Sequence, residues 1–445
     1  MSKQLGIFAQ RIWGWPMMIL FLLVGGIYTI GLRGIQFRRV RDAFQSITTG
    51  QSGQGISTYS ALCTALAATI GTGNIVGVAT AIGIGGPGAL FWMLVAALLG
   101  MGTQFAEGFL AVRYRSRSKM SVGGPFSYMD RGLNRPLLGK IYGVITIGAS
   151  VLGVGTITQI NSITKGISDL SPSSSLLFGH PTSTVMAGFA VTALAGTVLF
   201  GGSGRISTVC ETLVPVMSAI YLICSFILLI CHFREIPNGI AMIGKGAFCP
   251  EAAMGAGCGI GIRQVMRMGI SRGVFTNEAG MGTGAIAASA SSERDPIKQG
   301  LVTMSATLID TVVICTITGL CLIVTDAWKQ PLEGGAITAF AWQKGLPWSE
   351  RLSSYLLVIC LVFFAFATII GWHFYGERCL VYLTGGKGIM LYRLGYLGAL
   401  AIGPFLSVST AFDLSDILNA MMALPNLTSL FLLRGEVISY VRKNS

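Results

Sequence analysis

Charged residues are scarce in this chain. Only 11% of its 445 residues are Asp, Glu, Lys or Arg, whereas 52% are hydrophobic. A soluble domain normally carries about a quarter charged residues, and a soluble chain of this length would suggest roughly three domains. The composition therefore excludes an ordinary soluble protein and predicts one unit embedded in a lipid bilayer.

Residues that build metal and catalytic centres are also few. The three histidines are far apart, and none of the ten cysteines forms a CxxC pair. The sequence contains no HExxH or GxSxG motif, and the glycine-rich stretch 201–205 lacks the Lys-Ser/Thr of a P-loop. These absences argue against an intramembrane enzyme and against a bound cofactor. A channel is also disfavoured, because no ring-forming filter motif is evident.

The positive charge of the chain reflects topology rather than nucleic-acid binding. The net charge is +13, but the cations lie in short loops between apolar runs. If the loop at 33–41 is cytoplasmic, about 19 Lys and Arg fall on that side and about seven on the other. This asymmetry predicts a multi-pass protein of the cytoplasmic (inner) membrane, with its N-terminus outside and its C-terminus in the cytoplasm.

Apolar runs recur along the whole chain. A transmembrane helix needs about 20 apolar residues, and about eleven candidate runs occur. They lie at 15–32, 57–84, 88–112, 138–165, 185–200, 211–231, 259–290, 299–325, 353–375, 388–406 and 411–433. No convincing cleavage site follows the first run, so we expect it to be retained. The pattern predicts an all-α polytopic membrane protein.

Two of these runs are interrupted by glycine and polar residues near mid-span. The second contains Gly71-Thr72-Gly73-Asn74, and the seventh contains glycines and polar residues at 273–282. Close helix packing is the simpler explanation for a single glycine-rich stretch. Interrupted helices at matched positions, five spans apart, indicate a binding site built on inverted repeats. Broken backbone at membrane depth needs protein or a cavity around it, so the pair favours a carrier.

Longer motifs at these positions resemble one known family. The segment 69–79 reads TIGTGNIVGVA, 85–93 reads GGPGALFWM and 276–280 reads TNEAG. Together with Asp310-Thr311 and the Gly371-Trp372 pair, they resemble the alanine or glycine:cation symporter family, the sodium:alanine symporters. The resemblance runs from about Ser57 to the C-terminus.

This resemblance implies a fold and an activity. The fold is of the leucine-transporter type, a five-plus-five inverted repeat preceded by one extra helix. The activity is uptake of alanine or glycine, coupled to sodium or to protons, by alternating access. The alternative is another small neutral amino-acid permease of the same fold, for serine or D-alanine, driven by protons. Expected partners are the amino acid, the coupling ion and the lipid bilayer; neither nucleic acid nor an obligate protein partner is expected.

The same resemblance divides the chain into four parts. Residues 1–56 form an N-terminal transmembrane helix and a cytoplasmic loop, and residues 57–231 form the first repeat. Residues 232–258 form an external loop, and residues 259–445 form the second repeat with a short cytoplasmic C-terminus.

A zwitterionic substrate needs partners for a carboxylate and for an ammonium group. Backbone N–H groups at the first break suit the carboxylate, and carbonyls at 275–278 suit the ammonium. Phe275 would limit side-chain size, and Glu278 is an ionisable residue inside a span, either functional or paired with Arg272 or a backbone N–H. The resemblance supports Thr276 and Glu278 as substrate-binding residues and adds Gln159 and Trp372 to them. The expected substrate-binding residues are Gly71, Thr72, Gly73, Asn74, Gln159, Phe275, Thr276, Glu278 and Trp372.

Sodium requires several oxygen ligands, as hard cations do. The leucine-transporter pattern places carbonyls of Ala67, Ile70 and Phe364 and the hydroxyl of Thr368 around the ion. The family usually has a Ser-Thr pair where this chain has Ala367-Thr368, which leaves coupling to sodium or to protons open.

Other acidic residues lie in or beside the predicted spans. Glu107, Glu211 and Asp310 are candidates for ion coupling or for structural pairing, for example of Asp310 with an arginine. Asp413 and Asp416 are expected to cap the last span.

Overall fold

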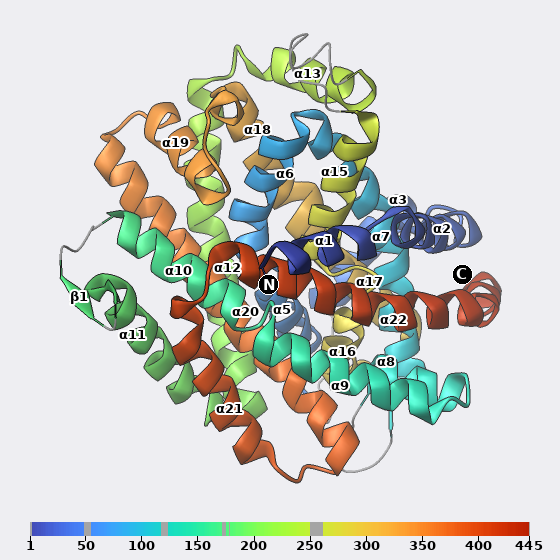
Figure 1. Cartoon of the computed structure of the whole chain (residues 1–445). Helices are drawn as coiled ribbons and strands as arrows, with labels where there is room; N and C mark the ends of the chain where they lie inside the picture. Colours follow the sequence, from blue (N-terminus) through green and yellow to red (C-terminus); the bar gives the residue numbers. More distant parts are fainter. Residues whose placement is uncertain are drawn as a thin grey trace.

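Helices make up most of the described chain, because apolar segments in a bilayer must satisfy their own backbone hydrogen bonds. The computed structural model describes residues 2–48, 55–116, 123–170, 175–177, 179–249 and 261–444. Within them the one sheet is a short antiparallel pair, in which Leu176 of β1 (Leu176–Leu177) lies opposite Pro181 of β2 (His180–Pro181). The structure is therefore a helical bundle (Figure 1).

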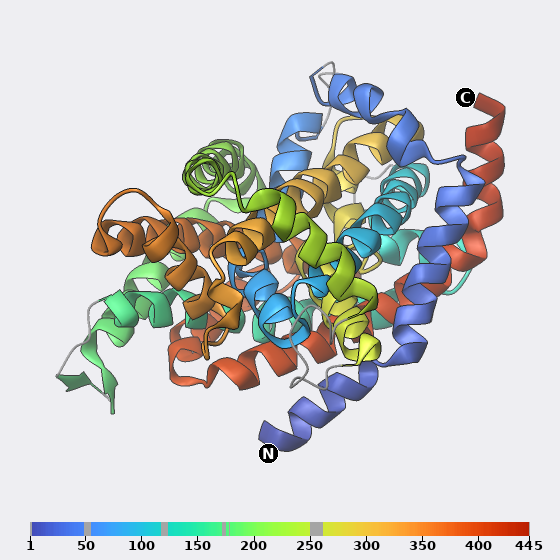
Figure 2. The ribbon, with the colours of Figure 1, turned by 90° about the horizontal axis from the view of Figure 1, so that it is seen from above.

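The N-terminal part lies along the outside of the bundle. It comprises α1 (Ser2–Ile12), α2 (Trp15–Gly31), α3 (Ile35–Arg38) and α4 (Val40–Thr48). Helix α2 packs against α7 (Gly88–Arg113) and α22 (Val408–Asn444), and α1 packs against α22. Figure 2 shows α2 and the C-terminal part of α22 side by side at the edge of the molecule.

The first predicted repeat begins with a broken helix. Its elements are α5 (Thr58–Thr69), η1 (Gly73–Gly77), α6 (Val78–Gly85), α7, α8 (Pro125–Ser127), η2 (Tyr128–Gly132), α9 (Pro136–Leu152), α10 (Ile157–Leu170), the two strands, α11 (Thr182–Leu199) and α12 (Gly202–Cys231). The parts before and after the interruption, Thr58–Thr69 and Gly73–Gly85, are bent by 49°. The predicted break in this span is therefore confirmed.

The second predicted repeat begins in the same way. Its elements are α15 (Ile262–Asn277), α16 (Thr283–Ala290), α17 (Pro296–Thr307), η3 (Leu308–Cys315), α18 (Thr316–Val324), η4 (Ala327–Lys329), α19 (Gly335–Gly345), α20 (Glu350–Thr384), α21 (Ile389–Ile402), η5 (Gly403–Phe405) and α22. Helices α15 and α16 are separated by a non-helical segment, so the seventh predicted run is also interrupted.

The segment predicted as an external loop is partly helical. Helix α13 (Ile236–Phe248) lies within 232–258 and packs against α7 and α18. Residues 250–258 of this prediction lie outside the described residues.

Fewer spans qualify by length and composition than the sequence predicts. Among the described residues, seven helices are long and apolar enough to cross a membrane, and eight if the bent pair counts as one span. Helix α2 has only 17 residues, and the segment Ile389–Phe405 is also short. Helix α15 contains Arg263, Arg267 and Arg272, which lower its apolar character. The count of about eleven includes these shorter or more polar segments.

Both breaks lie in the interior of the bundle. Helix α5 packs against α12, α16 and α20, and α15 packs against α6, α7 and η1. In Figure 1, α22 crosses the middle of the view, with α15 above it and α16 below it. The helix ends at the two breaks are therefore surrounded by protein, as broken backbone at membrane depth requires.

Candidate functional site

Glycine at the first break allows three other helices to come close. A Cβ atom at Gly73 would lie 3.0 Å from Thr276 Oγ1 and 3.3 Å from Thr276 Cα on α15. A Cβ atom at Gly71 would overlap Thr368 Oγ1 on α20 and would lie 3.5 Å from Gln159 Oε1 on α10. The structure thus brings together Gly71, Gly73 and three predicted site residues that are distant in sequence.

Two backbone amides at the first break have side-chain partners. Gly71 N–H donates to Asn74 Oδ1 (3.0 Å), and Thr72 N–H donates to Gln159 Oε1 at the long distance of 3.4 Å. These are N–H groups that the sequence assigned to a substrate carboxylate. Thr72 and Gln159, both predicted to bind the substrate, therefore lie next to each other.

Asn74 braces the break through both ends of its side-chain amide. Its Nδ2 donates to Asp310 Oδ1 (2.7 Å) and to the Asp310 carbonyl (3.2 Å). The other carboxylate oxygen of Asp310 accepts from Thr311 Oγ1 (2.6 Å). The suggested arginine partner for Asp310 is wrong, because Asn74 and Thr311 occupy both of its oxygens. Asn74 was predicted to contact substrate, but its polar atoms here contact protein.

The second break begins later than the sequence indicated. Helix α15 continues to Asn277, so Phe275 and Thr276 lie in its last turn rather than in unwound backbone. Glu278, Gly280 and Gly282 have φ values of +55°, +80° and +88°. Glycine adopts this left-handed region at little cost, so the two glycines place the break at 278–282.

Side chains from three other helices hold the polar backbone of the second break. Gln104 Nε2 donates to the Asn277 carbonyl (3.1 Å), and Tyr142 Oη donates to the Met281 carbonyl (2.7 Å). Asn426 Nδ2 donates to the Gly280 carbonyl (2.9 Å). Sequence reasoning missed Gln104, Tyr142 and Asn426. The available signal was a polar side chain inside an otherwise apolar run.

The carboxylate of Glu107 accepts hydrogen bonds at the second break. Its Oε1 accepts from Gly282 N–H (3.2 Å) and from Asn426 Nδ2 (2.8 Å). The carboxyl group is fully buried on α7. Of the two roles left open by the sequence, the contacts favour structural pairing with the broken backbone. Glu211 lies on α12, which packs against α5.

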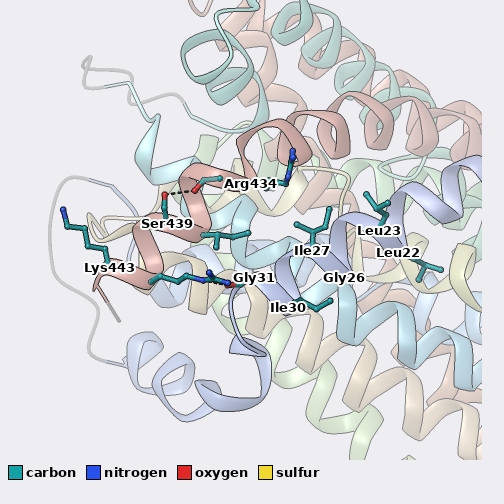
Figure 3. Close-up of a pocket in the computed structure, with 12 residues that line it drawn as sticks. Leu22, Leu23, Gly26, Ile27, Ile30, Gly31, Arg434, Ser439 and Lys443 are labelled. Atoms are coloured by element: carbon teal, nitrogen blue, oxygen red, sulfur yellow. Dashed lines mark hydrogen bonds between the residues drawn. The ribbon is translucent and has the colours of Figure 1, made fainter.

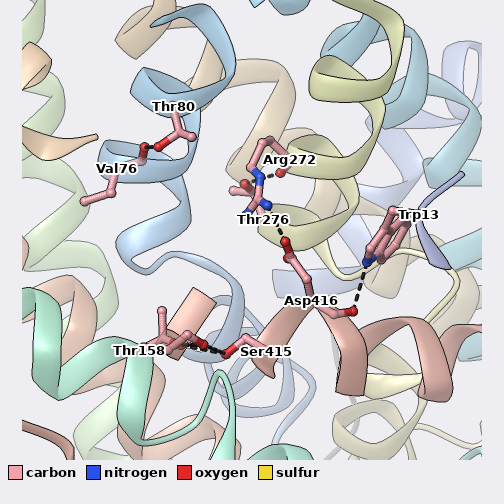
Figure 4. A network of polar contacts seen from close by, with 9 residues as sticks. Trp13, Val76, Thr80, Thr158, Arg272, Thr276, Ser415 and Asp416 are labelled. Atoms are coloured by element: carbon pink, nitrogen blue, oxygen red, sulfur yellow. Dashed lines mark hydrogen bonds and ion pairs between the residues drawn. The ribbon is translucent and has the colours of Figure 1, made fainter. Parts of the chain in front are cut away.

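Glu278 pairs with a tryptophan rather than with an arginine. Its Oε1 accepts from Trp372 Nε1 at 2.7 Å, and both side chains are buried. The suggested Arg272 partner is wrong, because Arg272 forms an ion pair with Asp416 on α22 (Figure 4). The two predicted site residues Glu278 and Trp372 are therefore in direct contact.

The Arg272–Asp416 pair lies immediately beside the predicted substrate residues. Thr276 Oγ1 donates to the Arg272 carbonyl (2.7 Å), and the guanidinium carbon of Arg272 lies 5.3 Å from the Phe275 ring centroid. Trp13 Nε1 donates to the Asp416 carbonyl (2.9 Å), as Figure 4 shows. Asp413 and Asp416 lie inside α22, which begins at Val408, so the prediction that they cap it is wrong.

An arginine side chain donates to backbone carbonyls at and just after the C-terminal end of α16. Arg115 donates to the carbonyls of Ser289 (3.3 Å), Ser291 and Glu293 (3.0 Å). Next to it, Ile56 N–H donates to the Ala290 carbonyl (3.1 Å). These contacts connect the C-terminal end of α16 to the segment that precedes α5 and to the segment that follows α7.

The residues assigned to sodium also lie at the first break. Because Gly71 N–H donates to Asn74 Oδ1 and Asn74 N–H donates to the Gly71 carbonyl, the carbonyls of Ala67 and Ile70 lack these helical donors. Thr368 Oγ1 donates to the Phe364 carbonyl at 3.1 Å and keeps lone pairs available. The Thr368 hydroxyl thus lies beside the first break, where a Cβ atom on Gly71 would overlap it.

Comparison with known proteins identifies the family. Residues 1–444 match the sequence model of the sodium:alanine symporter family. The chain belongs to this family. It is 38% identical over 441 residues to the sodium/alanine symporter AgcS of Methanococcus maripaludis, with 96% of this chain and 94% of AgcS covered. It is 33% identical over 444 residues to a Bacillus subtilis protein named probable sodium/glutamine symporter GlnT, with 98% and 89% covered.

A solved structure supports the fold. The crystal structure of MhsT in complex with L-phenylalanine superposes with a TM-score of 0.61 at 13% identity, covering 86% of this chain and 90% of MhsT. The expected leucine-transporter-type fold is therefore confirmed. The sodium:alanine symporter family consists of transporters, so the chain is a multi-pass secondary amino-acid symporter and not an enzyme.

Proposed function

We propose that this symporter imports alanine or glycine together with sodium by alternating access. The observation that carries the proposal is the close approach of the first break to three other helices. A Cβ atom on Gly73 would meet Thr276 in the last turn of α15, and one on Gly71 would meet Thr368 of α20 and Gln159 of α10. Glycine at such positions lets a small ligand approach the backbone. The name of the relative AgcS supports alanine as substrate and sodium as coupling ion.

The substrate would lie between the breaks. Its carboxylate would accept from the backbone N–H groups of Thr72 and Gly73. Thr72 N–H now has only a distant acceptor, whereas Gly71 N–H is already bound to Asn74. Its ammonium group would lie near Thr276 and the Glu278–Trp372 pair. Asn74 would act by holding the first break in shape rather than by touching the amino acid.

Phe275 would restrict the size of the substrate side chain. Its ring centroid lies 5.8 Å from that of Phe412, and the ring is 4% exposed. Such packing leaves little freedom for the ring to move aside. We expect a methyl group to be accepted and the longer side chain of glutamine, named for GlnT, to be rejected.

Sodium would bind to the carbonyls of Ala67, Ile70 and Phe364 and to the hydroxyl of Thr368. The second candidate is a proton-driven carrier of serine or D-alanine on the same fold. It is favoured by Ala367, which removes one hydroxyl from the position where the family usually has serine.

Uptake into proteoliposomes tests the proposal. Labelled alanine, glycine, serine, D-alanine and glutamine are compared under an inward sodium gradient and under a pH gradient without sodium. We expect alanine and glycine to accumulate only with the sodium gradient. Accumulation that follows the pH gradient and ignores sodium would replace the proposal by the proton-driven alternative.

The arrangement in the membrane is part of the same proposal. Residues 57–231 and 259–445 would form the two repeats, with 1–56 and 232–258 outside them. The N-terminus would be outside and the C-terminus in the cytoplasm of a cell with this protein in its inner membrane. Green fluorescent protein fused after the last residue should then fluoresce; a dark fusion at normal expression would reverse the orientation.

A further inference from the structure

A groove lies between α2 and the C-terminal part of α22, away from the candidate site. Its volume is about 970 Å³, and Figure 3 shows its lining side chains. The lining residues are Leu22, Leu23, Gly26, Ile27, Ile30, Gly31, Arg434, Gly435, Ile438, Ser439, Arg442 and Lys443. We refer to it as the α2–α22 groove.

Two glycines keep the α2–α22 groove open. A Cβ atom at Gly26 or at Gly435 would meet no heavy atom within 4 Å. At Gly31, by contrast, a Cβ atom would overlap Ile438, so the helices touch at that level. The groove is thus open above Gly26 and Gly435, next to the level at which α2 and α22 are in contact.

The apolar part of the groove has the length of one bilayer leaflet. From Leu22 to Gly31 the helix rises by about 13 Å, close to half of the roughly 30 Å hydrocarbon thickness. Ile30 is 79% exposed and Leu23 is 45% exposed on this surface. An acyl chain could lie along it over the two open glycines.

The lining of the groove carries three cations and no acid. Arg442 Nε donates to the Gly31 carbonyl (3.0 Å), which fixes its guanidinium group at the end of α2. Within the described residues, Arg434, Arg442 and Lys443 form no ion pair. The nearby acid Glu436 is bound instead to Arg113 (3.0 Å). A negative group at this end would therefore meet unneutralised charge.

We propose that the α2–α22 groove binds one anionic phospholipid. The phosphate lies at Arg442 and Lys443, and one acyl chain covers Gly26 and Gly435. Basic pockets between membrane helices suit anionic headgroups, and guanidinium groups pair well with phosphate. A second copy of this chain is a poorer occupant, because a two-fold contact through this face would bring the same cations of both copies together.

Native mass spectrometry of the full-length protein in detergent tests this proposal. The protein is mixed with phosphatidylglycerol or with phosphatidylcholine of the same acyl chains. We expect one phosphatidylglycerol to bind about tenfold or more in excess over phosphatidylcholine, since each cation near a membrane surface contributes about 1 kcal/mol. The variant R442A/K443A should reduce this preference to about twofold or less.

Variants that fill the groove distinguish a lipid bound in it from lipids bound elsewhere on the protein. Gly26→Leu should remove the bound lipid of either type, and Gly435→Leu gives a second route should the first variant fail to fold. Gly395→Leu on α21 is the matched control, because a Cβ there also meets nothing within 4 Å. Equal binding of the two lipids by the unmodified protein would overturn the proposal. So would lipid retained by both groove variants, lipid lost equally in the control, or a dimer mass that disappears with Gly26→Leu.

Discussion

Trp372 Nε1 donates a 2.7 Å hydrogen bond to Glu278 Oε1, joining the long helix α20 to the first residue of the second break. Glu278 is the residue with left-handed φ that ends α15. The bond therefore fixes both the carboxylate and the turn of the backbone. Because the two side chains are buried, removing the donor leaves a buried acceptor without this partner.

Trp372→Phe should lower alanine uptake by about five- to 150-fold while the protein still inserts. Loss of a hydrogen bond to a buried charged or polar group costs about 1–3 kcal/mol, and each 1.36 kcal/mol is about tenfold in rate. The measurement is initial uptake divided by the amount of reconstituted protein. Trp342→Phe is the control, because Trp342 is equally buried but its Nε1 has no hydrogen-bond partner among the residues that the structure describes. Equal losses in the two variants would refute a specific role for the bond.

Gly73→Ala should impair both transport and thermal stability. The added methyl group would lie 3.3 Å from Thr276 Cα, which is backbone and can move only with α15. Overpacking of this kind costs about 1–3 kcal/mol. Uptake and thermal unfolding in detergent are measured in parallel, with Gly395→Ala as the control at an open position. Wild-type uptake by Gly73→Ala would show that the close approach is dispensable.

Arg272→Gln should reduce stability more than the double variant R272Q/D416N does. The single change leaves Asp416 buried without its opposite charge, whereas the double change removes both charges. The difference is measured as the coupling between the two sites in thermal unfolding. If the stability changes of the two single variants simply add up in the double variant, the ion pair itself contributes nothing to stability.

Ala367→Ser should lower the sodium concentration for half-maximal uptake several-fold. The new hydroxyl adds one oxygen next to Thr368, and affinity for hard cations rises with ligand number. Ala365→Ser is the control, since Ala365 is also buried on α20 but lies two residues away and so on another face. An unchanged sodium dependence in Ala367→Ser would remove this position from the ion site.

The breaks could be predicted because their causes are local. Gly71, Gly73, Gly280 and Gly282 combine conformational freedom with polar neighbours inside apolar runs, and that signal is visible in the sequence. The exact start of the second break was missed, because helical geometry at Phe275 and Thr276 depends on packing against α7 and η1.

The pairing of charged and polar side chains could not be predicted. Arg272 and Asp416 are 144 residues apart, and Glu107 and Asn426 are 319 residues apart. The sequence shows that each must find a partner inside the bundle, but the choice among several partners is set by the relative positions of the helices. For this reason Glu278 was given the wrong alternative, Arg272, although Trp372 was also among the predicted residues.

Asn426 has a consequence for the order in which the protein is completed. It lies 146 residues after Gly280, yet its amide holds the Gly280 carbonyl and the Glu107 carboxylate. During synthesis, the earlier helices enter the membrane before α22 exists. The Gly280 carbonyl therefore lacks this donor until α22 has been made, so a chain truncated before residue 426 would present an unpaired polar group at the second break to cellular quality control.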